Sequence, residues 1–223
     1  MRDRSDQDWQ ELARREPYFA VLTDDRYRGD LSGDAREQFF ASGEADVEAL
    51  FTLLPLGFAP RSALDFGCGV GRLTRALAKR VERVHGVDVA PAMLELARQN
   101  VPSATFSSDL PDVEFDLIVS LLVFQHIPVA RGLEYLRELL ARLNGVAVIQ
   151  FTFRRPGGRL RRIARWLRAR LPLGPYMQMN EYSPDALRRV IADAGCSEPV
   201  ILPRMYADIE GGIVLTTRGQ ARA

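Results

Sequence analysis

Residues 63–74 read Ala-Leu-Asp-Phe-Gly-Cys-Gly-Val-Gly-Arg-Leu-Thr, and this stretch constrains the fold more than any other. An apolar run that leads into three alternate glycines predicts a buried strand, a sharp turn and then the start of a helix. The glycines let the backbone approach a ligand closely, and the start of a helix offers it unpaired N–H groups. The stretch is therefore typical of a nucleotide-cofactor site.

Two charged residues near the glycines argue against a dinucleotide as the ligand. In the dinucleotide-binding fingerprint, a glycine or alanine stands three residues after the second glycine. In this chain Arg72 holds that position, and Asp65 stands two residues before Gly67. A carboxylate at residue 65 would repel a pyrophosphate, but it suits a ligand that carries an ammonium group.

The rest of the chain alternates between strand and helix patterns, which favours a parallel sheet with helices on both faces. Apolar residues at helix-like spacing predict further helices over 6–54. Ser183, followed by proline, predicts a helix start, and apolar runs at 199–205 and 211–217 predict a final antiparallel pair. We expect strands near 62–66, 83–88, 104–107, 115–120 and 145–153, and helices near 70–81, 91–100 and 129–142.

Three more motifs follow the glycine stretch. Two of them each predict a strand that leads into a carboxylate. They are Val84-His-Gly-Val-Asp88 and Ala104-Thr-Phe-Ser-Ser-Asp109-Leu110. Residues 115–128, Phe-Asp-Leu-Ile-Val-Ser-Leu-Leu-Val-Phe-Gln-His-Ile-Pro, predict a fourth strand and the loop after it. Together with the glycine stretch, these motifs resemble those of the class I S-adenosylmethionine-dependent methyltransferases, closely over 60–150 and in outline over 180–217.

The resemblance implies that S-adenosylmethionine is the cofactor. Asp88 is expected on the ribose hydroxyls, where each charge-assisted hydrogen bond contributes roughly 1.5–3 kcal/mol. Asp109 is expected at the adenine amino group, with Asp112 as the alternative. Met93 is expected either beside the adenine or only in the helix core. The cofactor-binding residues expected from the resemblance are Asp65, Gly67, Cys68, Gly69, Gly71, Asp88, Val89, Met93, Asp109, Leu110 and Leu121.

The same resemblance places the methionine end of the cofactor and a candidate base. The glycine turn is expected to hold the amino-acid half, with Asp65 close to the ammonium and the backbone near Leu121 orienting the methionyl end. His126 is the candidate catalytic residue, because a neutral imidazole there removes a proton from an acceptor. The alternative for His126 is a packing role near the helix start that Pro128 marks.

The resemblance further implies a Rossmann-like, seven-stranded and mostly parallel sheet with helices on both faces. At 223 residues, the chain suits one methyltransferase domain. Within it we expect a helical N-terminal cover at 1–58, a cofactor-binding core at 59–153, an inserted lid at 154–182 between the fifth strand and the last helix, and that helix with the terminal strand pair at 183–223.

Residues 154–171 contain eight arginines and no acidic residue. Leucine, isoleucine and alanine recur among them every three or four residues, which predicts a basic amphipathic helix. Three interpretations stay open: a solvated lid over the acceptor, a surface for transient contact with a membrane or lipid-linked substrate, and an RNA-binding face. Nucleic acid is the least favoured partner, because the formal net charge is only +1.

The composition argues against disulfides, a signal peptide, a membrane span and a metal site. The two cysteines lie far apart in the sequence, so we expect no disulfide framework and a reduced, cytoplasmic setting. The first residues are too charged for a signal peptide, and no apolar run approaches the ~18–20 residues that span a bilayer. No cluster of histidines and carboxylates has metal-ligand spacing, so no metal is predicted. The sequence gives no indication of the oligomeric state.

The function that these patterns favour is methyl transfer from S-adenosylmethionine to an oxygen or nitrogen of a small molecule, either a biosynthetic intermediate or a sugar. One alternative is an RNA or lipid-linked acceptor that binds the arginine-rich segment. Another is a module that binds the cofactor without turnover. A dinucleotide-dependent oxidoreductase is disfavoured by Arg72 and Asp65.

Overall fold

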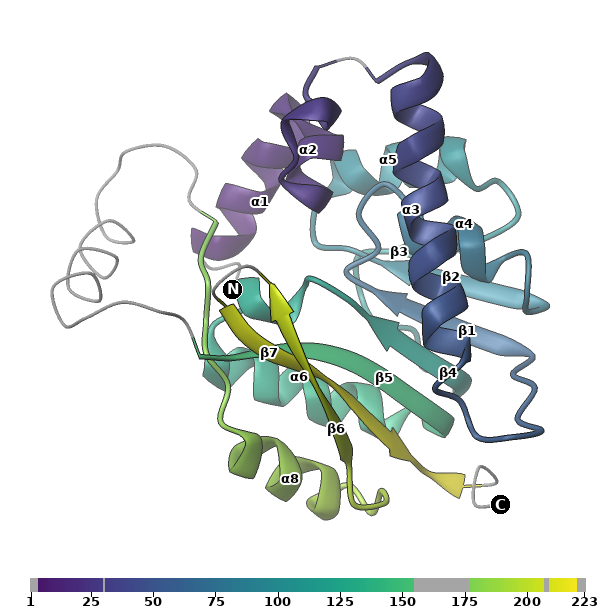
Figure 1. The fold of residues 1–223 in the computed structure, drawn as a ribbon, viewed down its shortest axis with the longest axis vertical. Helices are drawn as coiled ribbons and strands as arrows, with labels where there is room; N and C mark the ends of the chain where they lie inside the picture. The colour runs from purple at the N-terminus through teal and green to yellow at the C-terminus, as the bar shows by residue number, and fades with distance from the viewer. Residues whose placement is uncertain (1–3, 30, 155–176, 207–208, 220–223) are drawn as a thin grey trace, which may run out of the picture.

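The computed structural model describes residues 4–29, 31–154, 177–206 and 209–219 (Figure 1). The helices are α1 (Arg4–Arg15), α2 (Pro17–Leu22), α3 (Gly33–Phe51), α4 (Arg72–Leu77), α5 (Pro91–Asn100), α6 (Val129–Ala141) and α8 (Pro184–Asp193), with short 3-10 turns η1 (Asp25–Tyr27) and η2 (Phe124–His126). The strands are β1 (Ser62–Phe66), β2 (Arg83–Val87), β3 (Thr105–Ser107), β4 (Phe115–Ser120), β5 (Leu143–Arg154), β6 (Val200–Tyr206) and β7 (Ile209–Thr217).

The strands form one seven-stranded sheet in the order β3-β2-β1-β4-β5-β7-β6. The pairs among β1 to β5 are parallel, and β7 is antiparallel to both of its neighbours. This architecture confirms the expected mostly parallel sheet and the expected antiparallel pair at its end. The carboxyl ends of β1, β2 and β4 consequently meet at one edge of the sheet, where the motif residues follow.

The sheet is covered on both faces, because successive side chains of a strand point to opposite sides. Leu64 and Ile118 belong to the core cluster that includes residues of α6 and α8. Their neighbours Ala63 and Leu117 belong to the cluster that includes residues of α3 and α4. Figure 1 shows the same arrangement, with α6 and α8 on the face opposite α3 and α4. The strands at the centre are buried on both sides, as parallel sheets require.

One expected helix is shorter in the structure, and the expected start of another is confirmed. The helix expected over 70–81 is only Arg72–Leu77. Gly71 is its N-cap, and after Leu77 the N–H groups of Lys79 and Arg80 donate to carbonyls only three residues back. Ser183 holds the expected N-cap position of α8, but within the described residues its side chain makes no capping hydrogen bond. Its backbone oxygen instead accepts from the N–H groups of Ala186 and Leu187.

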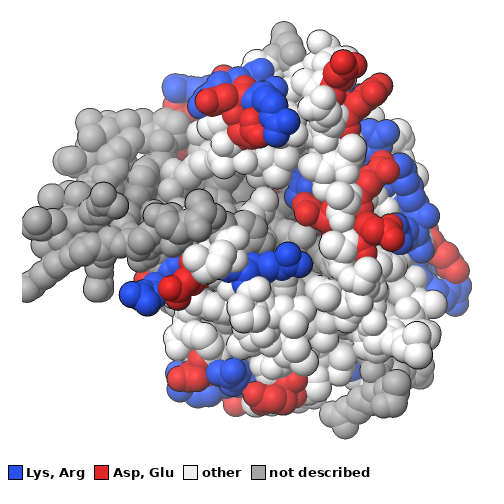
Figure 2. Space-filling model, in the orientation of Figure 1, with Lys and Arg blue, Asp and Glu red and all other residues white. Residues whose placement is uncertain are grey.

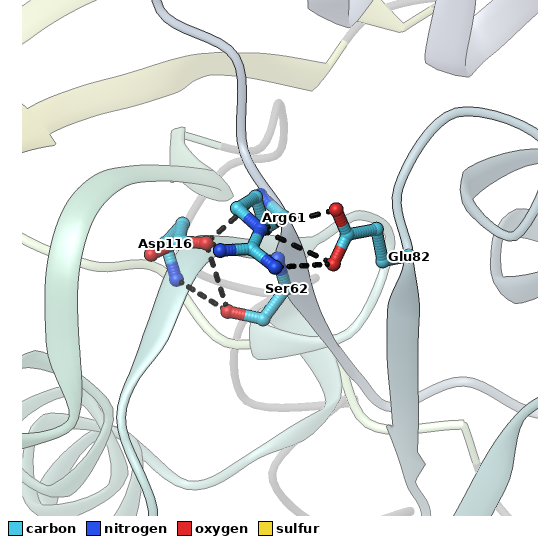
Figure 3. A network of polar contacts seen from close by, with 4 residues as sticks. All are labelled: Arg61, Ser62, Glu82 and Asp116. Atoms are coloured by element: carbon cyan, nitrogen blue, oxygen red, sulfur yellow. Dashed lines mark hydrogen bonds and ion pairs between the residues drawn. The ribbon is translucent and has the colours of Figure 1, made fainter.

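A polar network joins strands β1 and β4 at the sheet edge far from the motif ends (Figure 3). One carboxylate oxygen of Asp116 accepts from the backbone N–H of Arg61 at 2.8 Å and of Ser62 at 2.9 Å. The Arg61 guanidinium meets both oxygens of Glu82 at 2.9–3.1 Å. These bonds satisfy backbone donors where β1 begins and so fix its register beside β4.

Acidic side chains of α3 also pair with basic side chains of the segment that follows α4. Lys79 pairs with Glu44 and Arg80 pairs with Glu48. Figure 2 shows blue and red atoms interleaved along the right-hand edge of the molecule, where these two helices lie. Exposed pairs of this kind each contribute about 0–1 kcal/mol, so apolar packing holds the helices and the ion pairs set their alignment.

The arginine-rich helix expected at 154–171 falls largely outside the described residues, and so does most of the expected lid at 154–182. In the part of the chain that the structure describes, no helix is both long and apolar enough to cross a membrane.

Candidate active site

The glycine turn after β1 is built around positive φ angles. Gly67 has φ +76° and Gly69 has φ +53°, a region that L side chains rarely adopt. A Cβ on Gly67 would lie 2.3 Å from Cγ2 of Val123, so the turn also lacks room for a side chain. The N–H groups of Gly67 and Cys68 both donate to the carbonyl of Val87, at 2.7 and 3.0 Å. The end of β2 therefore holds the turn in place.

Gly71 has a different task from the other two glycines. Its φ is +88°, and it is the N-cap of α4. A Cβ there would lie 3.1 Å from Cγ2 of Val101 and 3.6 Å from Ala97, at the end of α5. Gly71 thus permits the close packing of α4 on α5 and stands outside the cavity described below.

Asp88 follows β2 and completes the turn from the other side. One carboxylate oxygen accepts from the N–H of Gly69 at 2.9 Å, and the other accepts from the N–H of Ala90 at 2.9 Å. Burial raises the pKa of this carboxyl, and the two backbone hydrogen bonds oppose that rise. The carboxylate is therefore fixed in position at the cavity wall.

Asp65 lies at the end of β1 and is only 1% exposed. Its Oδ2 accepts a 2.6 Å hydrogen bond from the hydroxyl of Thr74 on α4. Burial raises the pKa of Asp65 to about 6, although the Thr74 bond and the charge of Arg72 act in the opposite direction. Asp65 is thus a buried acid that becomes charged near neutral pH.

Cys68, in the middle of the turn, is 4% exposed, and its Sγ lies 3.7 Å from the carbonyl oxygen of Gly69. Desolvation, together with the nearby charges of Asp88 and Asp65, raises the pKa of this thiol well above its usual value. The sulfur is therefore protonated at neutral pH.

A cavity of about 340 Å³ opens where β1, β2 and β4 end. Its wall includes residues from α1, α2, the glycine turn, the segments after β2, β3 and β4, and α6. The sequence-predicted residues that it brings together are Asp65, Gly67, Cys68, Gly69, Asp88, Val89, Met93, Asp109, Leu110, Leu121 and His126.

The cavity lining bears on two alternatives that the sequence left open, namely Asp109 or Asp112 at the adenine and the role of Met93. Asp109 lies in the cavity wall, whereas Asp112 is fully exposed beside Arg142. Met93 is 2% exposed, lines the cavity and also packs in a core cluster with Phe39 and Ala90. Its position therefore fits both of the roles considered for it.

The loop after β4 is held in an unusual conformation. Leu122 has φ +63°, which is rare for a residue with a side chain. Its N–H donates to Oε1 of the buried Gln150 at 3.3 Å, and the hydroxyl of Ser120 donates to the carbonyl of Phe66 at 2.8 Å. These bonds fix the turn that puts Leu121 and Leu122 in the cavity wall, and such local strain often accompanies functional sites.

His126 lies in η2 and reaches the same cavity. Its Nδ1 is 2.6 Å from the carbonyl oxygen of Gln178, which only accepts, so Nδ1 carries the proton of the neutral ring. The lone pair is then on Nε2, which lies 3.1 Å from the amide nitrogen of Gln125. The amide oxygen of Gln125 accepts from Thr152 at 3.3 Å. The imidazole is therefore fixed with its basic nitrogen on the side away from residue 178.

Sequence reasoning missed the cavity residues of α1 and α6. The ring of Trp9 lies edge-on to His126, with ring centroids 4.8 Å apart. Asp6 bonds to Arg131 at 2.7 Å, and Arg131 donates to the hydroxyl of Tyr135 at 2.6 Å. The spacing of Trp9 indicated only a helical apolar face. One sequence feature could have indicated these residues. Asp6 is an acid three residues before Trp9 on the apolar face of the helix, where a charged side chain is unusual.

The fold and the cavity together define a class I S-adenosylmethionine-dependent methyltransferase. The profile of the methyltransferase domain family matches residues 63–145. A ubiquinone biosynthesis O-methyltransferase from Cereibacter sphaeroides is 30% identical over 174 residues, which span 71% of this chain and 67% of that protein. The chain therefore belongs to the S-adenosylmethionine-dependent methyltransferase family.

Two further comparisons differ in reach. A trans-aconitate 2-methyltransferase from an Enterobacter species is 40% identical over 94 residues, but these span only 39% of this chain and 37% of that protein. The crystal structure of magnesium protoporphyrin IX methyltransferase from Synechocystis, with bound S-adenosylmethionine, superposes with a TM-score of 0.63 at 19% identity. It covers 95% of this chain and 97% of that one, and at this identity it shows the shared fold.

Proposed function

We propose that the chain transfers the methyl group of S-adenosylmethionine to an oxygen or nitrogen of a small molecule, with His126 as the base. The observation that supports this most is that one cavity contains both the glycine turn with Asp88 and the oriented imidazole of His126. The residues that we assign to the cofactor and to proton removal thus line one cavity.

The wall residues fit the parts of the cofactor one by one. Asp88 is already fixed by two backbone N–H groups, so it presents oriented acceptors to the ribose hydroxyls. Asp65 offers a buried negative charge to the ammonium, and the turn at Leu121 borders the methionyl end. Asp109 lines the same cavity, and we assign it to the adenine amino group. Binding to oriented groups of this kind loses little conformational entropy.

The sulfonium of the bound cofactor supplies an activated methyl carbon. The chain's contribution is to hold the acceptor in line with that carbon and to remove its proton, and positioning alone accounts for much of such an acceleration. The acceptor's proton would pass to Nε2 of His126 as its oxygen or nitrogen takes the methyl group, the carbon–sulfur bond breaks and S-adenosylhomocysteine is left. The acceptor would take the place of the Gln125 amide, which lies 3.1 Å from Nε2 in the ligand-free protein. The carbonyl of Gln178 stabilises the resulting imidazolium through Nδ1–H.

The relatives support a small-molecule acceptor, because the two named above act, by their names, in ubiquinone biosynthesis and on trans-aconitate. The fold alone does not select an acceptor, since unrelated chemistries share this scaffold. An RNA or lipid-linked acceptor and a module without turnover are the outcomes that the following experiment distinguishes.

The test begins with calorimetric titration of S-adenosylmethionine and, separately, NAD into the wild-type protein and Asp88→Ala. We expect micromolar binding of the former, weakened at least tenfold in the variant, which corresponds to about 1.4 kcal/mol. Asp112→Ala removes an exposed carboxylate nearby and should bind like the wild type. Binding of NAD alone, or of neither ligand, contradicts the proposal.

The second stage screens small phenols, alcohols and amines for formation of S-adenosylhomocysteine. With an acceptor found, His126→Gln should lower kcat at least tenfold while leaving cofactor affinity unchanged. A salt-sensitive affinity for RNA, or turnover only with lipid vesicles, would favour the other acceptors. An unchanged kcat in His126→Gln would show that His126 only packs.

A further inference from the structure

Two side chains of α1 border the cavity next to the candidate base. Asp6 and Trp9 are three residues apart, so they lie on the same face of the helix, and both line the cavity. Trp9 contacts the ring of His126, and Asp6 contacts Arg131 in the first turn of α6. The Asp6–Arg131 ion pair therefore lies one helical turn of α1 from Trp9, which contacts His126.

This ion pair is shielded from water. Nη1 of Arg131 lies 2.7 Å from Oδ1 of Asp6, and the side chains are 28% and 8% exposed. Nη2 of Arg131 donates to the hydroxyl of Tyr135, and the guanidinium lies over that ring, 5.1 Å from its centroid. The positive charge of Arg131 thus has a carboxylate partner from a different helix.

The other arginines of the described cavity wall are engaged elsewhere. Arg72 is 3% exposed and bonds to Asp46 of α3 at 2.6 Å. Arg142 bonds to the carbonyl oxygens of Pro111 and Glu138. It lies eleven residues after Arg131 along α6, a distance of roughly 16 Å at 1.5 Å per residue. Arg131 is therefore the guanidinium of the described wall whose partner, Asp6, lies one helical turn from Trp9, the residue that contacts His126.

We propose that Asp6 is a specificity residue, which keeps Arg131 occupied and so restricts the enzyme to acceptors that carry no negative charge near the reacting atom. This inference rests on the function proposed above. A carboxylate on the acceptor would have to displace Asp6 from Arg131, and Asp6 would repel it from a site of low dielectric constant. An acceptor with an uncharged hydroxyl or amine meets neither obstacle.

The apolar part of the same wall agrees with an uncharged acceptor. The cavity that His126 reaches is also lined by Trp9, Val123, Ile127 and Pro128. Such a lining binds an aromatic or aliphatic body, while the few polar groups orient it. The substrate class is therefore a small, uncharged and largely apolar molecule with one protic group, for which a phenol is the simplest example.

The test uses trans-aconitate, a small molecule with three carboxylates, as an anionic probe. It is titrated calorimetrically into the full chain saturated with S-adenosylhomocysteine. We expect no measurable binding to the wild type. We expect Asp6→Asn to bind the probe at least tenfold more tightly than the weakest affinity that the titration detects. Asn keeps the size of the side chain and removes its charge. In Asp6→Asn/Arg131→Gln this gained binding should disappear.

The matched control is Glu11→Gln, which neutralises an exposed carboxylate of the same helix that pairs with Arg15. It should behave as the wild type does. Wild-type protein that binds the probe, or Asp6→Asn that does not, overturns the inference. Binding of S-adenosylhomocysteine is measured first in every variant, so that failure of the proposed function and failure of this inference can be told apart. A wild type that does not bind S-adenosylhomocysteine contradicts the proposed function. A wild type that binds it leaves only the role of Asp6 in question.

Discussion

At the scale of single residues, the buried carboxyl of Asp65 lowers the stability of the ligand-free protein at neutral pH. Its carboxyl is almost fully buried and has one strong hydrogen bond, from Thr74. Desolvation raises the pKa of Asp65 to about 6, so the folded protein binds its proton more tightly than the unfolded chain does. The contribution of this group to stability is therefore present below about pH 4 and is lost as pH rises to about 6.

We expect Asp65→Asn to stabilise the ligand-free protein at pH 8 and to weaken S-adenosylmethionine binding at least tenfold. The stabilisation follows because an uncharged amide avoids the desolvation of a carboxylate, which is about 3 kcal/mol for a pKa raised to about 6. The affinity of the wild type should also fall as pH drops below about 6, because the protonated acid no longer attracts the ammonium. The variant should lack this dependence.

Chemical denaturation and calorimetry between pH 5 and pH 8, chosen to bracket the pKa of about 6, measure both effects. Asp112→Asn, at an exposed position, serves as the control. If Asp65→Asn binds the cofactor as tightly as the wild type at pH 8, the carboxylate does not contact the ammonium and only orders the turn.

At the scale of elements, the contact between α3 and α4 determines how the N-terminal helices meet the cofactor site. Gly43 is buried on α3, and a Cβ there would lie 2.5 Å from the backbone oxygen of Arg72. This close approach brings Asp46 within reach of the Arg72 guanidinium. A glycine in the middle of a helix costs about 0.5–1 kcal/mol relative to alanine, so a packing reason is needed to retain it.

Gly43→Ala should therefore destabilise the protein, although alanine is the better helix former. The gain in helix propensity is about 1 kcal/mol, whereas the displaced partner is backbone, and overpacking against it costs about 1–3 kcal/mol. We expect a net loss of about 1 kcal/mol in the free energy of unfolding from urea titration. Ala41→Gly, at an exposed position of the same helix, calibrates the propensity effect. A more stable Gly43→Ala would mean that α3 can move away from α4 at little cost in free energy.

The elements also show where sequence reasoning succeeded and where it stopped. β1, β4 and the glycine turn were predictable, because burial, alternation and positive φ each leave a local pattern. The pairing of Asp6 with Arg131 was not, because the two residues lie 125 positions apart and only the docking of α1 brings them together. The same holds for His126 and Gln178, since a backbone carbonyl leaves no signal in the sequence.

At the scale of the whole molecule, the cavity lies between two parts of unlike construction. The wall on one side consists of strand ends, where β1, β2 and β4 are held by parallel neighbours on both sides. The wall on the other side consists of α1 and α2, which Figure 1 shows beyond the sheet edge. Val21 of α2 comes close to the turn, since a Cβ on Gly69 would lie 2.9 Å from it.

We expect S-adenosylmethionine to slow amide hydrogen exchange in α1, α2 and the glycine turn, while exchange in β6 and β7 stays unchanged. The reason is that a ligand stabilises the segments it contacts, by about 2.7 kcal/mol at a hundredfold excess over Kd. Exchange followed by mass spectrometry, with and without the ligand, measures this directly. Protection confined to the turn and the end of β2 would show that the N-terminal helices are not part of the cofactor site.

The burial of Cys68 has a consequence for the enzyme's own integrity. The cofactor is an alkylating agent, and a thiolate is the strongest nucleophile among protein side chains near neutral pH. Cys68 lines the cavity in which we propose that the cofactor binds. Because burial and two neighbouring acids raise the pKa of the thiol, the sulfur stays protonated and weakly reactive. The carboxylates that we assign to the ammonium and the ribose thereby also protect the protein from methylating itself.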